Sequence, residues 1–203
     1  MSGRRPSTGT EEYADRLKRL ASVWWKRILP VQAPYRWHIR RLRLGKTLDV
    51  GCGAGRNLEH LGGRGVGVDH NASLVRTARA RGFEAFTPEE FRSSPRADPG
   101  SYDSLLFAHV LEHMTGAEAK ALVDSYVPFL RSGGRVVMVT PQERGFAADP
   151  THIDFMDFEH IRSLCAQAGL EVVHSYSFPL PRWTGKFFPY NEFVVIARLL
   201  ARR

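Results

Sequence analysis

From residue 46 onward, short apolar segments alternate with amphipathic ones, and this alternation constrains the fold more than any other feature of the sequence. The apolar segments have the length and the branched side chains typical of strands, whereas the segments between them repeat apolar residues at helical spacing. Strands that alternate with helices favour a doubly wound parallel sheet with helices on both faces. The expected strands are 46–50, 65–69, 83–86, 102–109, 133–140, 170–178 and 191–200. A capping box of Thr115 and Glu118 predicts a helix over 116–130.

The ends of the chain depart from this alternation. No helical segment separates the last two expected strands, so we expect them to pair as an antiparallel hairpin at the sheet edge. Before residue 45, the spacing of apolar residues predicts one helix over 10–28 and a short one over 35–42. We therefore divide the chain into an N-terminal helical extension, 1–44, and a main domain, 45–203.

The composition is that of a globular protein, because 43% of the 203 residues are hydrophobic and 25% are charged. No apolar run approaches the roughly 20 residues of a membrane span, and the N-terminus lacks the apolar core of a signal peptide. Cys52 and Cys165 are too few for a disulfide framework, so we expect a cytoplasmic protein. The net charge of +8 comes from scattered basic residues without a nucleic-acid motif, which disfavours a nucleic-acid partner.

The segment "LDVGCGAGRN", residues 48–57, carries the strongest signal for a ligand. Its glycines would let the backbone approach a ligand closely between an expected strand and an expected helix. The dinucleotide fingerprint, its main rival, requires glycine at the sixth position, where this chain has Arg56. Asp69 ends the next strand, where it either accepts hydrogen bonds from the ribose of an adenosine-containing ligand or caps the following helix.

Four motifs, "LDVGCGAG", "GVGVD", "YDSLLFAHVLEHM" and "LRSGGRVVMVTP", have the order and spacing found in class I S-adenosylmethionine-dependent methyltransferases. The chain resembles that family, including its type 11 and ubiquinone-biosynthesis branches, from about Thr47 to Leu199. The resemblance implies an α/β, Rossmann-like, doubly wound sheet of seven strands, mostly parallel with an antiparallel edge hairpin. It also implies S-adenosylmethionine bound across the carboxyl ends of the central strands. The cofactor contacts that it suggests are Asp49, Gly51, Cys52, Gly53, Asp69, His70, Phe107, Ala108 and His109.

The adenine contacts depart from the family pattern. Many relatives carry an acidic "GD" element after the third strand, where this chain has "FTPEEF". Glu89 and Phe91 are the candidate substitutes.

The segment "DPTHIDFMD", residues 149–157, follows the fifth expected strand. Methyl transfer to an alcohol oxygen needs a base, and the pKa of histidine suits that role, so we predict His152 as the general base. The resemblance adds His113 as a further catalytic candidate and assigns Asp157 to a helix N-cap. Asp154 is a third catalytic candidate, as a group that could orient His152. Three roles stay open for Asp149 and Asp154: orienting His152, binding Mg²⁺ together with Glu143, or facing solvent.

Aromatic residues of two segments are expected on the acceptor side, although they could equally close the end of the sheet. They are Trp24, Trp25, Tyr35, Trp37, Trp183, Phe187, Phe188 and Tyr190. Aromatic faces beside polar groups suit a sugar, and the N-terminal extension would form part of the acceptor lid. The chain also resembles actinobacterial sugar methyltransferases of methylmannose polysaccharide synthesis, which implies dependence on Mg²⁺.

We therefore predict S-adenosylmethionine-dependent O-methylation of a small polar acceptor, a sugar hydroxyl, with the 1-hydroxyl of a methylated mannoside as the candidate. The alternative acceptor is the phenolic hydroxyl of a quinone precursor or a similar compound. Two other classes stay open: a binding protein that keeps the fold without catalysis, and an NAD-dependent oxidoreductase.

Overall fold

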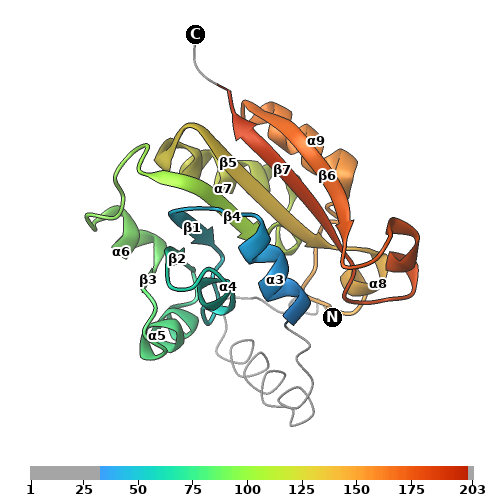
Figure 1. Cartoon of the computed structure of the whole chain (residues 1–203), viewed down its shortest axis with the longest axis horizontal. Coiled ribbons are helices and arrows are strands. Elements are labelled where there is room, and N and C mark those ends of the chain that lie inside the picture. The colour runs from blue at the N-terminus through green and yellow to red at the C-terminus, as the bar shows by residue number, and fades with distance from the viewer. Residues whose placement is uncertain (1–32, 201–203) are drawn as a thin grey trace, which may run out of the picture.

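The computed structural model describes residues 33–200, in which seven strands form one sheet of order β3-β2-β1-β4-β5-β7-β6 (Figure 1). All neighbouring strands are parallel except β7, which is antiparallel to both β5 and β6. The predicted doubly wound sheet with an antiparallel edge hairpin is therefore confirmed. The strands are β1 (Thr47–Val50), β2 (Gly65–Val68), β3 (Ala85–Phe86), β4 (Tyr102–Ala108), β5 (Leu130–Pro141), β6 (Leu170–Phe178) and β7 (Glu192–Leu199).

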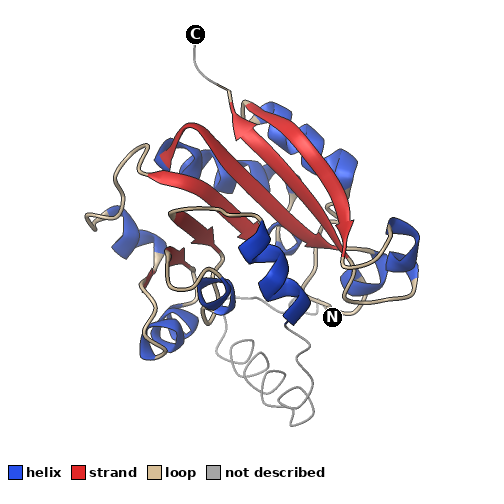
Figure 2. Ribbon diagram, viewed as in Figure 1, coloured by secondary structure: helices blue, strands red, loops and turns tan. Residues whose placement is uncertain are grey.

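Helices cover both faces of this sheet, with α3 in front of it and α7 and α9 behind it in the view of Figure 2. The predicted helix over 10–28 lies outside the described residues, and the division of the chain at residue 45 stays a prediction. Within the described part of the chain, no helix is long and apolar enough to cross a membrane. The helices are α3 (Ala33–Arg41), α4 (Arg56–His60), α5 (Ala72–Ala80), α6 (Pro88–Arg92), α7 (Gly116–Tyr126), α8 (Glu143–Phe146) and α9 (Phe158–Gln167), with 3₁₀ turns η1 (Leu111–His113), η2 (Val127–Phe129) and η3 (Arg182–Lys186).

The alternating side chains of the central strands divide the core into two layers. In β4, Leu105 and Phe107 pack with the residues of α7 and α9, whereas Leu106 and Ala108 face the side of α3, α4 and α5. Because both faces are covered, β4 is buried along nearly its whole length, as its continuous apolar sequence predicts.

Local capping explains where the helices behind the sheet begin. Thr115 and Glu118 form the predicted capping box of α7, and the Asp157 carboxylate accepts from two amides at the start of α9, as predicted. The end of α7 was predicted wrongly. The helix stops at Tyr126 instead of continuing to residue 130, because Pro128 cannot donate a helical hydrogen bond, and β5 starts earlier than expected.

Candidate functional site

The loops that follow β1, β2 and β4 meet where the direction of winding reverses. The chain runs outward from β1 through β2 to β3 and then returns to β4 on the other side of β1. In doubly wound sheets, ligands bind at this switch point, outside the carboxyl ends of the strands. The glycine-rich segment and the segment around His109 lie on either side of it.

The glycine-rich loop after β1 is held against β2. The amides of Gly51 and Cys52 both donate to the Val68 carbonyl, at 2.8 and 3.1 Å. Gly51 has a φ of +79°, and a Cβ atom there would lie 2.8 Å from the Val110 side chain. Only glycine meets both conditions, so this loop keeps its backbone close to the start of the β4 loop.

Asp69 joins the loops that follow β1 and β2. Its two carboxylate oxygens each accept one backbone hydrogen bond of 2.8 Å, from Gly53 and from Asn71. Asn71 is the N-cap of α5, so the alternative role of Asp69 as that cap is excluded. A carboxylate oxygen can accept more than one hydrogen bond, so Asp69 keeps acceptor capacity for a ligand. The neighbouring His70 ring is largely exposed, 3.7 Å from the Asp69 carboxylate.

Asp49 is a fully buried carboxylate in the middle of β1. Neither of its oxygens has a hydrogen bond of good geometry within the described part of the chain. Burial raises its pKa to about 7, and nearby Asp69 adds to the rise, while the Asn57 amide and the Arg56 guanidinium oppose it. A fully buried carboxylate with so little hydrogen bonding is costly to keep charged, so this group is poised to respond to a cationic ligand.

A small pocket opens between α3 and the carboxyl ends of the central strands. Of the predicted cofactor contacts at the end of β4, Ala108 and His109 line it. The ring of Phe107, the third predicted contact there, is fully buried in the core behind the sheet, so only its backbone is left to contact a cofactor, and the contact stays a prediction. The lining residues are Tyr35, His38, Ile39, Arg56, Asn57, Ala108, His109, Val139 and Glu192.

His109 stands between two carboxylates directly after β4. It has a φ of +59°, a conformation that costs a non-glycine residue energy, and its amide donates to the Val139 carbonyl at 2.9 Å. Its Nε2 lies 2.6 Å from Glu192 Oε1, and its Nδ1 lies 3.4 Å from Glu112 Oε1. Burial lowers the pKa of His109, but Glu192 and Glu112 outweigh burial and raise it to about 9.

Glu112 connects η1 to the loop of residues 149–157. Its side chain is fully buried, and within the described part of the chain neither carboxylate oxygen has a hydrogen-bond partner of good geometry. Its backbone carbonyl accepts from the amides of Ile153 and Asp154, at 2.7 and 3.3 Å. The backbone of Glu112 thus holds the loop that carries His152.

His152 is oriented by a backbone carbonyl. Its Nδ1 lies 2.8 Å from the Phe146 carbonyl oxygen, which can only accept, so Nδ1 carries the proton and Nε2 has the lone pair. Nε2 lies 4.0 Å from Glu112 Oε1. The Phe146 carbonyl is thus the partner of Nδ1, where the sequence had suggested the carboxylate of Asp149 or Asp154.

The predicted oxygen ligands for Mg²⁺ do not gather. Asp149 accepts from the amide and hydroxyl of Thr151, and Glu143 pairs with Arg182, 2.5 and 2.9 Å from its guanidinium. Within the described part of the chain, one group has the donors for a metal ion: Glu112, His113 and His152. Two imidazoles and a single carboxylate do not fit Mg²⁺, which prefers oxygen ligands.

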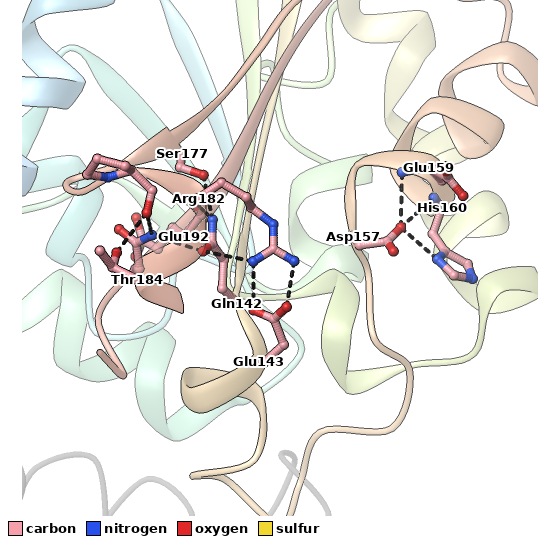
Figure 3. A network of polar contacts seen from close by, with 11 residues as sticks. Gln142, Glu143, Asp157, Glu159, His160, Ser177, Arg182, Thr184 and Glu192 are labelled. Carbon is pink, nitrogen blue, oxygen red and sulfur yellow. Dashed lines mark hydrogen bonds and ion pairs between the residues drawn. The ribbon is translucent and has the colours of Figure 1, made fainter. Parts of the chain in front are cut away.

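A separate polar network fixes the segment between β6 and β7 (Figure 3). Gln142 is fully buried, and its amide donates to the Ser177 hydroxyl at 2.8 Å and to the Glu192 carbonyl at 2.9 Å. This network positions the backbone of Glu192, a site residue that the sequence analysis missed. A charged residue at the start of the apolar strand "FVVIA" was the available signal.

The predicted aromatic residues of the acceptor side divide into two groups. Tyr35 lines the pocket, whereas large fractions of other rings are exposed, 68% of Trp183 and 75% of Phe187. Phe91 is fully buried among other aromatic rings, so it cannot replace the missing adenine contact, and Glu89 is exposed. Trp24 and Trp25 lie outside the described residues.

Comparison with known sequences shows which family the chain belongs to. The family described as "Methyltransferase domain" matches residues 10–175. A ubiquinone biosynthesis O-methyltransferase of Xanthomonas oryzae pv. oryzae is 27% identical over 158 residues, which cover 68% of this chain and 65% of that protein. The match thus spans just under two thirds of the length of this curated relative.

Comparison with solved structures supports the fold. The complex between the Trm112 methyltransferase activator and a putative methyltransferase of Haloferax volcanii gives a TM-score of 0.70 at 18% identity, covering 96% of this chain and 97% of that chain. Magnesium protoporphyrin IX methyltransferase from Synechocystis, with bound SAH, gives a TM-score of 0.64 at 14% identity, covering 96% of this chain and 97% of that chain.

Proposed function

The chain belongs to the class I S-adenosylmethionine-dependent methyltransferases, and from this premise we propose that it methylates a hydroxyl oxygen of a small polar acceptor. The observation that carries the proposal is the orientation of His152, whose Nε2 lone pair lies in the cluster that follows β4. The relative from Xanthomonas oryzae is named as an O-methyltransferase, which supports oxygen as the acceptor atom.

The cofactor supplies a methyl group on a positively charged sulfur atom. We propose that Asp69 accepts hydrogen bonds from its ribose and that the backbone from Gly51 to Gly53, with Cys52, lies along its methionine part. Ala108 and His109 would flank the sulfonium, and His70 would lie beside the adenine. Glu192 lines the pocket and would add negative charge beside this cation, which favours its binding.

The protein's part in the reaction is to orient the acceptor, exclude water and remove one proton. The bound cofactor would supply the methyl group to the hydroxyl oxygen and would keep the electron pair of the carbon–sulfur bond on its sulfur atom. We propose that the hydroxyl proton passes to Nε2 of His152. The Phe146 carbonyl, 2.8 Å from Nδ1, and the Glu112 carboxylate then stabilise the imidazolium.

Two acceptor classes follow from different observations. A sugar hydroxyl, such as the 1-hydroxyl of a methylated mannoside, has a high pKa and needs a base such as His152. Exposed aromatic rings such as Trp183 suit the C–H face of a sugar. A phenolic hydroxyl of a quinone precursor is favoured by the name of the Xanthomonas relative. We propose the sugar as the first candidate and the phenol as the second.

An activity screen tests the proposal and separates the two acceptors. Purified protein is first titrated with S-adenosylmethionine by calorimetry, and absence of binding would overturn the proposed function. Methylated mannosides and phenols are then offered with and without Mg²⁺, and labelled methyl product is measured. For a sugar acceptor, His152→Ala should lower kcat by about 10²- to 10⁴-fold, the usual contribution of a general base. For a phenol the loss should be much smaller, and exposed His174→Ala is the control in both cases.

A further inference from the structure

Two imidazoles and a carboxylate meet beside the site, and their arrangement suits a ligand other than the cofactor. One potential ligand atom from each of Glu112, His113 and His152 lies within 4.8 Å of the other two. The rings of His113 and His152 are tilted by 58°, with their centroids 4.8 Å apart. Two histidines and one carboxylate are the protein ligands of many catalytic zinc sites.

The buried Glu112 carboxylate gives a second, independent indication. It is fully buried, and within residues 33–200 neither oxygen has a hydrogen-bond partner of good geometry, although Oε1 lies 3.4 Å from Nδ1 of His109 and 4.0 Å from Nε2 of His152. Two carboxylates, of Glu112 and Glu192, flank the single imidazole of His109 in this cluster. A divalent cation would supply both the missing charge and the missing ligand contact.

The orientation of both rings is compatible with ligation through Nε2. Nδ1 of His152 faces the Phe146 carbonyl at 2.8 Å, and Nδ1 of His113 lies 3.3 Å from the Thr151 carbonyl. A histidine that binds a metal usually donates its other N–H to such a carbonyl, which fixes the ring.

The distances require only small side-chain movements. Ligand atoms about 2.1 Å from a tetrahedral ion lie roughly 3.4 Å from one another. The 4.0 Å between His152 Nε2 and Glu112 Oε1 must therefore shorten by well under 1 Å. The widest pair, bounded by 4.8 Å, must shorten by less than about 1.5 Å, which side-chain rotation can supply.

We propose that Glu112, His113 and His152 bind a divalent transition-metal ion of the zinc type, and that the bound ion withholds Nε2 of His152 from the methyl acceptor. A nitrogen lone pair cannot bind a metal and accept a proton at the same time. The ion is therefore an inhibitor, and its occupancy sets the fraction of active molecules. The inhibition rests on the proposed function, whereas the binding site does not.

Cobalt(II) is the probe for binding, because four-coordinate Co²⁺ has a visible absorption that reports its geometry. We expect the metal-free, full-length protein to bind one Co²⁺ with that absorption and to release it to Zn²⁺, which binds nitrogen ligands more tightly. Glu112→Gln and His113→Gln should each weaken binding at least tenfold, and His174→Ala should leave it unchanged. Thermal unfolding without metal identifies a variant that has failed to fold. In that case, Co²⁺ binding by the other variant tests whether these residues form the site.

Activity is measured separately with the best acceptor of the screen. Methyl transfer should fall in proportion to Zn²⁺ occupancy and recover on chelation. Absence of stoichiometric Co²⁺ binding, or binding that both variants retain, would overturn the site. A rate that rises with Zn²⁺ would overturn the inhibition. Co²⁺ binding without any methyl transfer would contradict the proposed function and leave the metal site standing.

Discussion

Replacing Asp49 with asparagine should change how the stability of the protein depends on pH. The Asp49 carboxyl is fully buried in β1, and burial raises its pKa to about 7. In the unfolded chain its pKa returns to about 3.9. Between these values the folded protein binds a proton that the unfolded chain does not. This proton stabilises the folded protein. Its contribution to the free energy of unfolding is fully present below pH 4 and is lost as the pH rises to 7.

The size of the effect follows from the two pKa values. Each pH unit within this window changes the free energy of unfolding by about 1.4 kcal/mol, so the two units from pH 5 to pH 7 correspond to about 3 kcal/mol. Asparagine does not titrate. The free energy of unfolding of Asp49→Asn, relative to the original protein, should therefore rise by about 3 kcal/mol from pH 5 to pH 8.

Urea denaturation at a series of pH values, without cofactor, measures this difference, in which the contributions of all other titrating groups cancel. Asp103→Asn is the matched control. Its carboxylate is partly exposed, and the Lys46 amide and Arg131 lower its pKa. Asp103 is ionised in both states above pH 5, so this control should show no pH-dependent change. A flat difference for Asp49→Asn, or a fall from pH 5 to pH 8, would refute the reasoning.

Three further predictions concern the backbone and the packing around the site. Gly51→Ala should abolish cofactor binding in calorimetry, because the new Cβ atom would lie 2.8 Å from the Val110 side chain. Gly53 has open space around it, so Gly53→Ala should lower the free energy of unfolding by only about 1–2 kcal/mol. Thr115→Ala removes the capping box of α7 and should lower the free energy of unfolding by about 1 kcal/mol, with kcat unchanged. Tyr176→Phe removes the 2.5 Å contact between the Tyr176 hydroxyl and Nε2 of His38. The free energy of opening of α3, measured by amide hydrogen exchange, should therefore fall by about 1 kcal/mol.

The sequence predicted the parts of the fold that are encoded locally. Alternating apolar segments identified the strands, and Thr115 and Asp157 marked helix starts because capping acts within one helical turn. The short helices α6 and α8 were missed. Each is too short for its apolar residues to repeat, so periodicity carries no signal there.

The candidate site was predictable only where a single loop forms it. Gly51 and Asp69 were found because their roles depend on their own backbone and on the strand that each one follows. The cluster around His109 could not be read in this way, because 83 residues separate it from Glu192. Likewise, acids close to His152 in sequence were suggested as its partners, whereas its ring faces a backbone carbonyl and Glu112.

The reversed direction of β7 explains how Glu192 reaches the site. β7 is inserted between β5 and β6, and its first residue, Glu192, pairs with Pro141 at the carboxyl end of β5. Because β7 is antiparallel to β5, the start of β7 lies at the same edge of the sheet as the ends of β4 and β5. A parallel strand would bring its first residue to the opposite edge, away from His109. The antiparallel strand therefore supplies the charge that keeps His109 protonated.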